Sequence, residues 1–236
     1  MGYNTNSKMA NDQSWILKEV SELSEILKVP SELKRYIYVF GGCPRDLLRG
    51  TNPRDLDVRV PTFAVAEALL KSLLATRKLL EVKKTITMDY PGVSPTEYTC
   101  YKLVIKTPST QRLEVDISYS RATSVAEDSM GFCDFTCNNI TMSLDGEIST
   151  RIKPWQIGLG EEFTEAEWTV KCIRDCIKGE LVWMIPNRFT ESMGANDASC
   201  AAFMEKMLQR QQKMLRKGFV LAGEEERYLT SFRLVE

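Results

Sequence analysis

The chain has 236 residues and a formal net charge of −1, with 43% hydrophobic and 27% charged residues. With a net charge close to zero, the chain as a whole does not attract nucleic acid. A nucleic-acid partner would need a local basic face. The sequence contains no histidine, which excludes Ser-His-Asp triads, Cys-His dyads and histidine-ligated zinc.

The N-terminal segment predicts a soluble location for the protein. Residues 1–13 are polar and lack the apolar stretch of a signal peptide, and we expect them to form a flexible tail. No apolar run in the sequence approaches the roughly 18 residues that a membrane span requires. We therefore expect a cytoplasmic protein with no membrane partner.

Hydrophobic periodicity predicts helices and strands in the first two thirds of the chain. Apolar residues at helical spacing indicate a helix over Trp15–Leu27, which Pro30 ends. Short alternating or β-branched runs predict strands, and an Ala- and Leu-rich run predicts a long helix. The expected strands are 36–40, 56–60, 98–106 and 112–119, with a turn at Pro108-Ser109, and the long helix covers 63–80.

The pattern changes to helices towards the C-terminus. Residues 161–178 and 197–217 both have helical periodicity, and the loop between them contains Pro186 and Gly194. We therefore expect a mixed head domain over 14–150 and a helical extension over 151–236.

One segment combines two aspartates with a pair of glycines. Asp55 and Asp57 lie two apart on an expected strand, so their carboxylates project from the same face. Adjacent carboxylates repel unless a cation lies between them, and hard oxygen ligands suit Mg²⁺. Gly41 and Gly42 follow a strand and open a short helix that can bind an anion, and Arg45 can add a bidentate phosphate contact. The segment therefore predicts a magnesium site beside a phosphate-binding turn.

A third carboxylate is expected on the strand 112–119. Glu114 and Asp116 share one face of this strand, and either can complete a three-acid site. We favour Asp116, because Val115 and Ile117 beside it indicate a well-anchored strand. For all these acids the alternative is an ordinary solvated strand face.

Two motifs in this order carry a resemblance to a known enzyme family. Gly-Gly-x-x-Arg-Asp-x-Leu-x-Gly followed by Asp-x-Asp occupies 41–57, and Asp-Phe-Thr-x-Asn followed by Leu-Asp-Gly occupies 134–146. Together they resemble the class II tRNA nucleotidyltransferase (CCA-adding enzyme) and bacterial poly(A) polymerase family. The resemblance implies an α+β fold, with a polymerase-beta-like nucleotidyltransferase head, in which helices flank a small mixed sheet, and a helical neck-like extension.

The resemblance also implies a reaction. It is the template-independent addition of nucleotides from NTP, ATP and/or CTP, to an RNA 3′ end of the tRNA CCA type or the poly(A) type. A two-metal mechanism with two Mg²⁺ ions would release pyrophosphate. Asp55 and Asp57 would be catalytic metal ligands, and Asp116 would be the third.

Further residues carry over to the nucleotide. Gly41, Gly42 and Arg45 would meet the triphosphate. Asp134 and Asn138 would help to hold the nucleotide, and a helix would present both on one face. The chain departs from the family in two places, because 132–133 replace an arginine pair and 165–172 lack the base-selecting Asp and Arg.

The last expected helix has a basic stripe that predicts contact with an RNA backbone, and the resemblance implies tRNA as such a partner. Its members follow one another at four-, three- and four-residue steps and therefore share one face: Lys206, Arg210, Lys213 and Lys217. A second stripe consists of Lys171, Arg174 and Lys178. The alternative for both stripes is a solvated helix face.

Seven cysteines and no signal peptide predict reduced thiols. The pairs Cys133/Cys137 and Cys172/Cys176 have four-residue spacing on expected helices. They predict either buried thiols or, less favourably, a structural zinc site. Two other functions stay open: a minimal nucleotidyltransferase that modifies a protein or small molecule, and a non-catalytic nucleotide- or RNA-binding relative.

Overall fold

The computed structural model describes residues 24–25, 29, 31–51, 53, 55–75, 79–88, 98–105, 113–120, 133–185, 197–222 and 228–229. The expected tail 1–13, nearly all of the expected helix Trp15–Leu27 and the Pro108-Ser109 turn lie outside this part of the chain. Within it, no helix is long and apolar enough to cross a membrane.

The chain divides into two compact units, and each unit consists of three separate segments of the sequence. The first unit comprises Met1–Asp89, Thr96–Val125 and Thr141–Ile148. The second comprises Tyr90–Pro95, Ala126–Ile140 and Ser149–Glu236. The second unit thus takes in part of the expected head domain, including the Asp-Phe-Thr-x-Asn motif.

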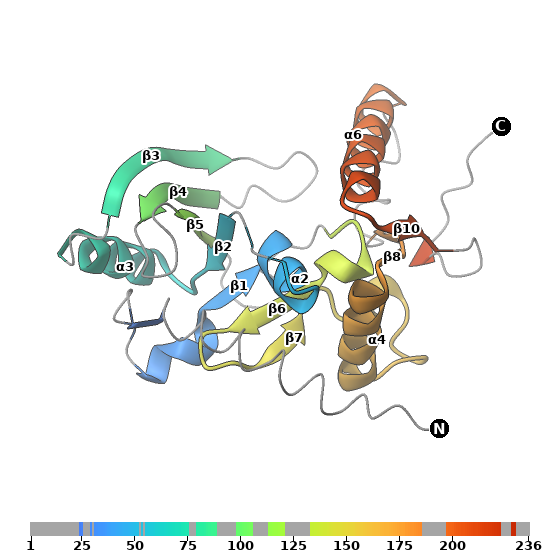
Figure 1. The fold of residues 1–236 in the computed structure, drawn as a ribbon, viewed down its shortest axis with the longest axis horizontal. Coiled ribbons are helices and arrows are strands. Elements are labelled where there is room, and N and C mark those ends of the chain that lie inside the picture. Colours follow the sequence, from blue (N-terminus) through green and yellow to red (C-terminus); the bar gives the residue numbers. More distant parts are fainter. Residues whose placement is uncertain are drawn as a thin grey trace. The chain divides into compact units, whose positions relative to one another are not determined.

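A seven-stranded mixed sheet has the order β3-β4-β5-β2-β1-β6-β7 (Figure 1), and most of its residues belong to the first unit. Strands β2 and β5 are parallel, whereas β1 pairs with both β2 and β6 in the antiparallel sense. The α+β class and the mixed sheet expected from the sequence are confirmed. The strands are β1 (Tyr38–Phe40), β2 (Asp55–Arg59), β3 (Leu79–Met88), β4 (Tyr98–Ile105), β5 (Leu113–Ser120), β6 (Ile140–Ser143) and β7 (Ile148–Thr150).

Two α-helices and a 3₁₀ helix accompany this sheet: α2 (Gly42–Leu48), α3 (Phe63–Ala75) and Ser31–Tyr36. One face of the sheet is apolar and packs in the same core as α3. The alternation of β2 and β5 sends every second side chain to that core. The buried core includes Leu56, Val58, Val115 and Ile117 from the strands and Ala66, Leu69 and Leu73 from α3. The intervening residues of β2 and β5 therefore occupy the opposite face, and several of them are acidic.

Two elements of the first unit differ from the sequence expectation. The helix expected over 63–80 ends at Ala75, and β3 begins at Leu79. Leu79 and Leu80 suit a helix as well as a strand, and pairing with β4 decides in favour of the strand. The β6–β7 hairpin was not predicted from the sequence, and its turn contains Gly146 at a φ of 94°.

The second unit contains α4 (Glu165–Lys178) and α6 (Asp197–Arg216), close to the two expected helices. Four strands not predicted from the sequence form two short parallel pairs: β8 (Glu180–Leu181) with β10 (Val220–Leu221), and β9 (Met184–Ile185) with β11 (Tyr228–Leu229). Two 3₁₀ helices, Thr136–Asn138 and Pro154–Ile157, complete the described elements of this unit.

The ends of α4 have clear local causes. The Thr164 hydroxyl accepts a hydrogen bond from the Glu167 backbone N–H, and the Glu167 carboxylate accepts one from the Thr164 backbone N–H, which forms a capping box. The same contacts hold the pKa of Glu167 below its usual value. Gly179 ends the helix at a φ of 77°.

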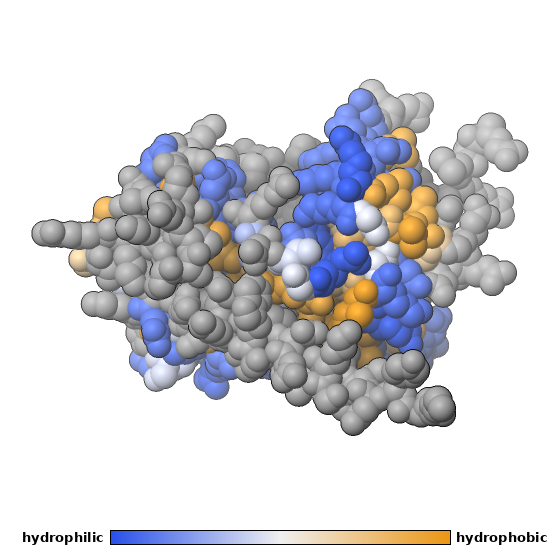
Figure 2. All heavy atoms as spheres, in the orientation of Figure 1, coloured by the Kyte–Doolittle hydropathy of each residue, from blue (hydrophilic) through white to orange (hydrophobic). Residues whose placement is uncertain are grey.

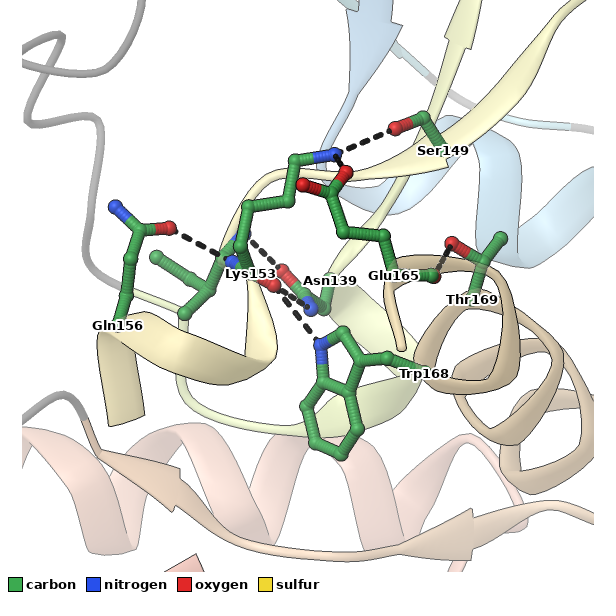
Figure 3. Close-up of polar contacts among 8 residues, drawn as sticks. Asn139, Ser149, Lys153, Gln156, Glu165, Trp168 and Thr169 are labelled. Carbon is green, nitrogen blue, oxygen red and sulfur yellow. Dashed lines mark hydrogen bonds and ion pairs between the residues drawn. The ribbon is translucent and has the colours of Figure 1, made fainter. Parts of the chain in front are cut away.

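A network of buried polar contacts fixes α4 to the segment that precedes it (Figure 3). The Asn139 side chain accepts a hydrogen bond from the Ile152 backbone N–H at 2.7 Å and donates one to its carbonyl at 2.9 Å. The indole N–H of the fully buried Trp168 donates to the same carbonyl at 2.9 Å. Lys153 adds an ion pair of 2.8 Å with Glu165 at the first turn of α4. These contacts connect the first turns of α4 to Asn139 and to the segment at Ile152 and Lys153.

Candidate functional site

The acids predicted from the sequence lie on the polar face of the sheet. In the parallel register of β2 and β5, Asp55 is opposite Glu114 and Asp57 is opposite Asp116. Register partners in a parallel pair project to the same face, so four carboxylates form two adjacent rows. Asp55 and Glu114 are exposed, whereas Asp57 and Asp116 are half-buried. Of the two candidates for the third carboxylate, Asp116 is therefore the one beside Asp57.

Gly41 is packed against the Asp57 carboxylate. Phe40, the last residue of β1, pairs with Asp57 in the antiparallel register of β1 and β2. Gly41 follows directly and therefore lies next to Asp57. A Cβ atom at Gly41 would lie 2.4 Å from Oδ2 of Asp57. The backbone of Gly41 has a φ of 73° and a ψ of −127°, a conformation essentially restricted to glycine. The expected glycine turn and the expected acids thus meet at one point of the first unit.

Arg45 was expected to contact phosphate, and in the structure its guanidinium group pairs with Asp46. The side chain is buried, and its Nε and Nη2 atoms lie 2.8 and 2.7 Å from Oδ1 of Asp46. A Cβ at Gly42 would come within 3.1 Å of the same Nη2 atom. Gly42 therefore leaves space for the Arg45 guanidinium, and the phosphate contacts expected of both residues stay predictions.

Lys102 was not identified from the sequence, yet it belongs to the acid face. It is opposite Asp116 in the antiparallel register of β4 and β5, and its Nζ donates a hydrogen bond to Oδ2 of Asp116. The available sequence signal was that Lys102 is the single charged residue of β4. A charged residue in a strand does not identify its partner, because the partner depends on the register of β4 with β5.

The Asp57–Asp116 pair fits the ligand chemistry of Mg²⁺. Among the residues that the structure describes, no three His, Cys, Asp or Glu side chains converge closely enough to cage a metal ion. Mg²⁺ does not need such a cage, because one or two carboxylates commonly bind it together with waters and substrate phosphates. The two half-buried acids can provide that partial set, with Asp55 next to them on β2.

In the second unit, Asp134 is the centre of a buried polar cluster. Its Oδ2 lies 2.6 Å from Nε of Arg210, and its Oδ1 accepts hydrogen bonds from the Asn138 side chain at 2.8 Å and the Phe135 backbone at 3.0 Å. The expectation that a helix presents Asp134 and Asn138 on one face is wrong. Asp134 precedes a 3₁₀ helix that begins at Thr136, and a direct side-chain contact joins the two residues instead.

The basic stripe of α6 is exposed, but one of its members has a structural partner. Lys206, Lys213 and Lys217 are exposed, and Figure 2 shows a hydrophilic surface over this helix. Arg210 instead directs its Nε to Asp134 while about half of its side chain stays exposed. In the second expected stripe, Lys171 is buried and bonds to both carboxylate oxygens of Asp175 at 2.9 Å, so it is not part of a surface track.

Replacing Arg210 by Ala is expected to destabilise the protein by about 1–3 kcal/mol. The substitution removes a charged hydrogen-bond donor from a carboxylate that is only 1% exposed. Because the arginine side chain is about half exposed, the expected loss of stability is smaller than for a fully buried ion pair. Urea unfolding measures the loss, and the exposed Lys213→Ala variant on the same helix should stay within about 0.5 kcal/mol of the parent. Equal stability of the two variants would contradict the structural role of Arg210.

Five cysteines are buried thiols: Cys43, Cys133, Cys137, Cys172 and Cys176. Burial raises the pKa of Cys133 to about 12 and also raises the pKa of Cys172 above its ordinary value. No metal-binding group of three or more side chains includes these cysteines in the described part of the chain. The zinc alternative is thus unsupported, and Cys133 lies outside any helix, contrary to expectation.

Comparison with known protein families and curated proteins produced no match. Among solved structures, a CCA-adding enzyme in apo form I is similar, with 19% identity and a TM-score of 0.47 over 91% of this chain. A CCA-adding enzyme in complex with ATP has 19% identity and a TM-score of 0.46 over 94% of this chain. The Bacillus stearothermophilus CCA-adding enzyme in complex with CTP has 20% identity and a TM-score of 0.42 over 87%. The chain spans 40%, 41% and 42% of the lengths of these three proteins, respectively.

Proposed function

We propose that the protein is a Mg²⁺-dependent nucleotidyltransferase that adds nucleotides from NTP to an RNA 3′ end without a template. The position of Asp57 carries the proposal. Its carboxylate lies against the Gly41 turn and beside Asp116 in the sheet. A triphosphate approaching the backbone of this turn would bring its oxygen atoms to the acids, which is the arrangement that metal-assisted phosphoryl chemistry needs.

The proposed reaction is attack of a hydroxyl oxygen on the α-phosphorus of the NTP. A new P–O bond forms to the RNA end, and the bond to the leaving pyrophosphate breaks. Two bound Mg²⁺ ions would supply activation of the attacking oxygen and neutralisation of the leaving phosphates. Asp55, Asp57 and Asp116 would hold them. The strands keep the acids at fixed spacing, so the protein's contribution is positioning and charge stabilisation, which requires no histidine.

The second unit contains the residues that the resemblance assigns to nucleotide contacts and the basic face proposed to bind RNA. Asp134 is nearly inaccessible, so we expect it to position Asn138 and Arg210 towards a nucleotide rather than to touch the ligand itself. The exposed Lys206, Lys213 and Lys217 would follow RNA phosphates, and binding through them should weaken as salt concentration rises.

Incubation with labelled triphosphates, Mg²⁺ and total RNA tests the proposal, with each of the four nucleotides in turn. We expect EDTA-sensitive label in RNA, from ATP or CTP. Label in protein or in a small molecule would instead identify a minimal nucleotidyltransferase of another acceptor class. Nucleotide or RNA binding without transfer under any condition would leave a non-catalytic relative.

A further inference from the structure

Lys102 lies at one end of a row of charged side chains that crosses three strands. The registers place Lys102 of β4 opposite Asp116 of β5, and Asp116 opposite Asp57 of β2. The second row of acids, Asp55 and Glu114, is two residues away along the same strands. Four carboxylates on one sheet face repel one another, and the ammonium group of Lys102 offsets part of this repulsion.

The contact of Lys102 engages a carboxylate that the metal site would use. Its Nζ donates to Oδ2 of Asp116, the acid beside Asp57. A divalent cation bound by Asp57 and Asp116 would need a lone pair of the same carboxylate and would repel the ammonium group. The two cations therefore compete for Asp116.

The lysine side chain is able to give way. The side chain of Lys102 is 40% exposed, against 24% for Asp116, so the lysine is the more solvent-accessible member of the pair. Lysine has a flexible stem and a strongly hydrated point charge, and the ammonium group can move into water without breaking the sheet. Lys102 is the partner of Asp116 in the structure, and a divalent cation from solution would be the alternative partner.

We propose that Lys102 is a positioning residue that lowers the affinity of the acid face for a divalent cation in the absence of nucleotide, by occupying Asp116. The inference rests on the proposed metal-dependent function. It implies that the metal binds tightly only together with a triphosphate, whose phosphate oxygens add ligands and negative charge that outweigh the lysine. The residue therefore couples metal binding to nucleotide binding.

Direct measurement of Mn²⁺ binding by electron paramagnetic resonance, without nucleotide, tests this inference on the full chain. Lys102→Met should bind Mn²⁺ about five- to tenfold more tightly than the parent, which corresponds to the loss of one competing ion pair. Lys102→Arg should stay close to the parent, because it keeps the charge. Lys71→Met, on an exposed position of α3, is the matched control and should leave the affinity unchanged.

A second readout follows the stability of the fold. In EDTA, Lys102→Met should melt at a lower temperature than the parent, because the carboxylates lose a neutralising charge. Added Mn²⁺ should raise its melting temperature by more than it raises that of the parent. Unchanged or weaker Mn²⁺ binding by Lys102→Met would overturn the inference.

The outcomes separate this inference from the proposed function. If the parent binds Mn²⁺, Asp57→Asn abolishes that binding and Lys102→Met has no effect, the metal site stands and only the role of Lys102 fails. If Mn²⁺ binding is indifferent to Asp57→Asn, the metal site itself fails, and the role of Lys102 fails with it. If only Lys102→Met binds Mn²⁺ and the parent does not, Lys102 prevents binding of the cation at Asp116 completely, which supports the inference.

Discussion

Asp57→Asn is expected to reduce nucleotide transfer by about a thousandfold or more, equivalent to at least about 4 kcal/mol of transition-state stabilisation. The amide keeps the shape of the side chain but removes the charge that would hold a divalent cation next to Asp116 and the Gly41 turn. The measurement is the single-turnover rate of label transfer at saturating Mg²⁺, compared with the parent protein.

The fold should tolerate this substitution. Asp57 is only half-buried and lies beside Asp116 in the sheet, and the amide has the size and shape of the carboxylate, so we expect the variant to stay folded. Glu162→Gln changes an exposed acid of the second unit and serves as the control, with unchanged transfer expected. A folded Asp57→Asn protein with turnover within tenfold of the parent would remove this residue from the mechanism.

Gly41→Ala is expected to abolish most of the transfer activity because the new methyl group collides with the catalytic acid. The Cβ would lie 2.4 Å from Oδ2 of Asp57, a distance that real Cβ contacts do not reach. Either Asp57 rotates away or the turn after β1 shifts, and both changes separate the acid from the phosphate-binding backbone. We expect at least about a hundredfold loss of transfer and a loss of about 1–3 kcal/mol of stability.

Gly50→Ala is the matched control for this variant. Gly50 also has a positive φ, 67°, but a Cβ there meets no atom within 4 Å. The control should therefore lose about 1 kcal/mol of stability from backbone strain alone and keep full transfer at a temperature where both variants are folded. Equal loss of transfer in the two variants would show that backbone strain, not contact with Asp57, explains the effect.

Local features of the sequence were sufficient for the strands that carry the acids. The alternation of apolar and acidic residues in β2 and β5 predicts both their extended conformation and the shared face of Asp55 and Asp57, because both properties depend only on neighbours in the chain. The glycine pair after β1 predicts a tight turn for the same reason. Helix α4 was expected from its periodicity and is delimited by its own caps, Thr164 and Gly179.

The partners of these residues depend on strand order and register, which no local pattern contains. The proximity of Asp116 to Asp57 requires β5 to lie beside β2, although the two acids are 59 positions apart in the sequence. Lys102 joins the acid face only through the register of β4 with β5. The boundary between α3 and β3 was likewise decided by pairing with β4, since Leu79 and Leu80 suit both states.

The amino-acid sequence by itself determined the chemical groups of this protein: paired carboxylates, a glycine turn, a basic helix and no imidazole. Only the tertiary structure decided how charges distant in sequence are neutralised, with Lys102 on Asp116 and Arg210 on Asp134. The reason is physical. Side-chain type and local periodicity act over a few residues, whereas the pairing of buried or crowded charges is chosen by the free energy of the whole packed fold.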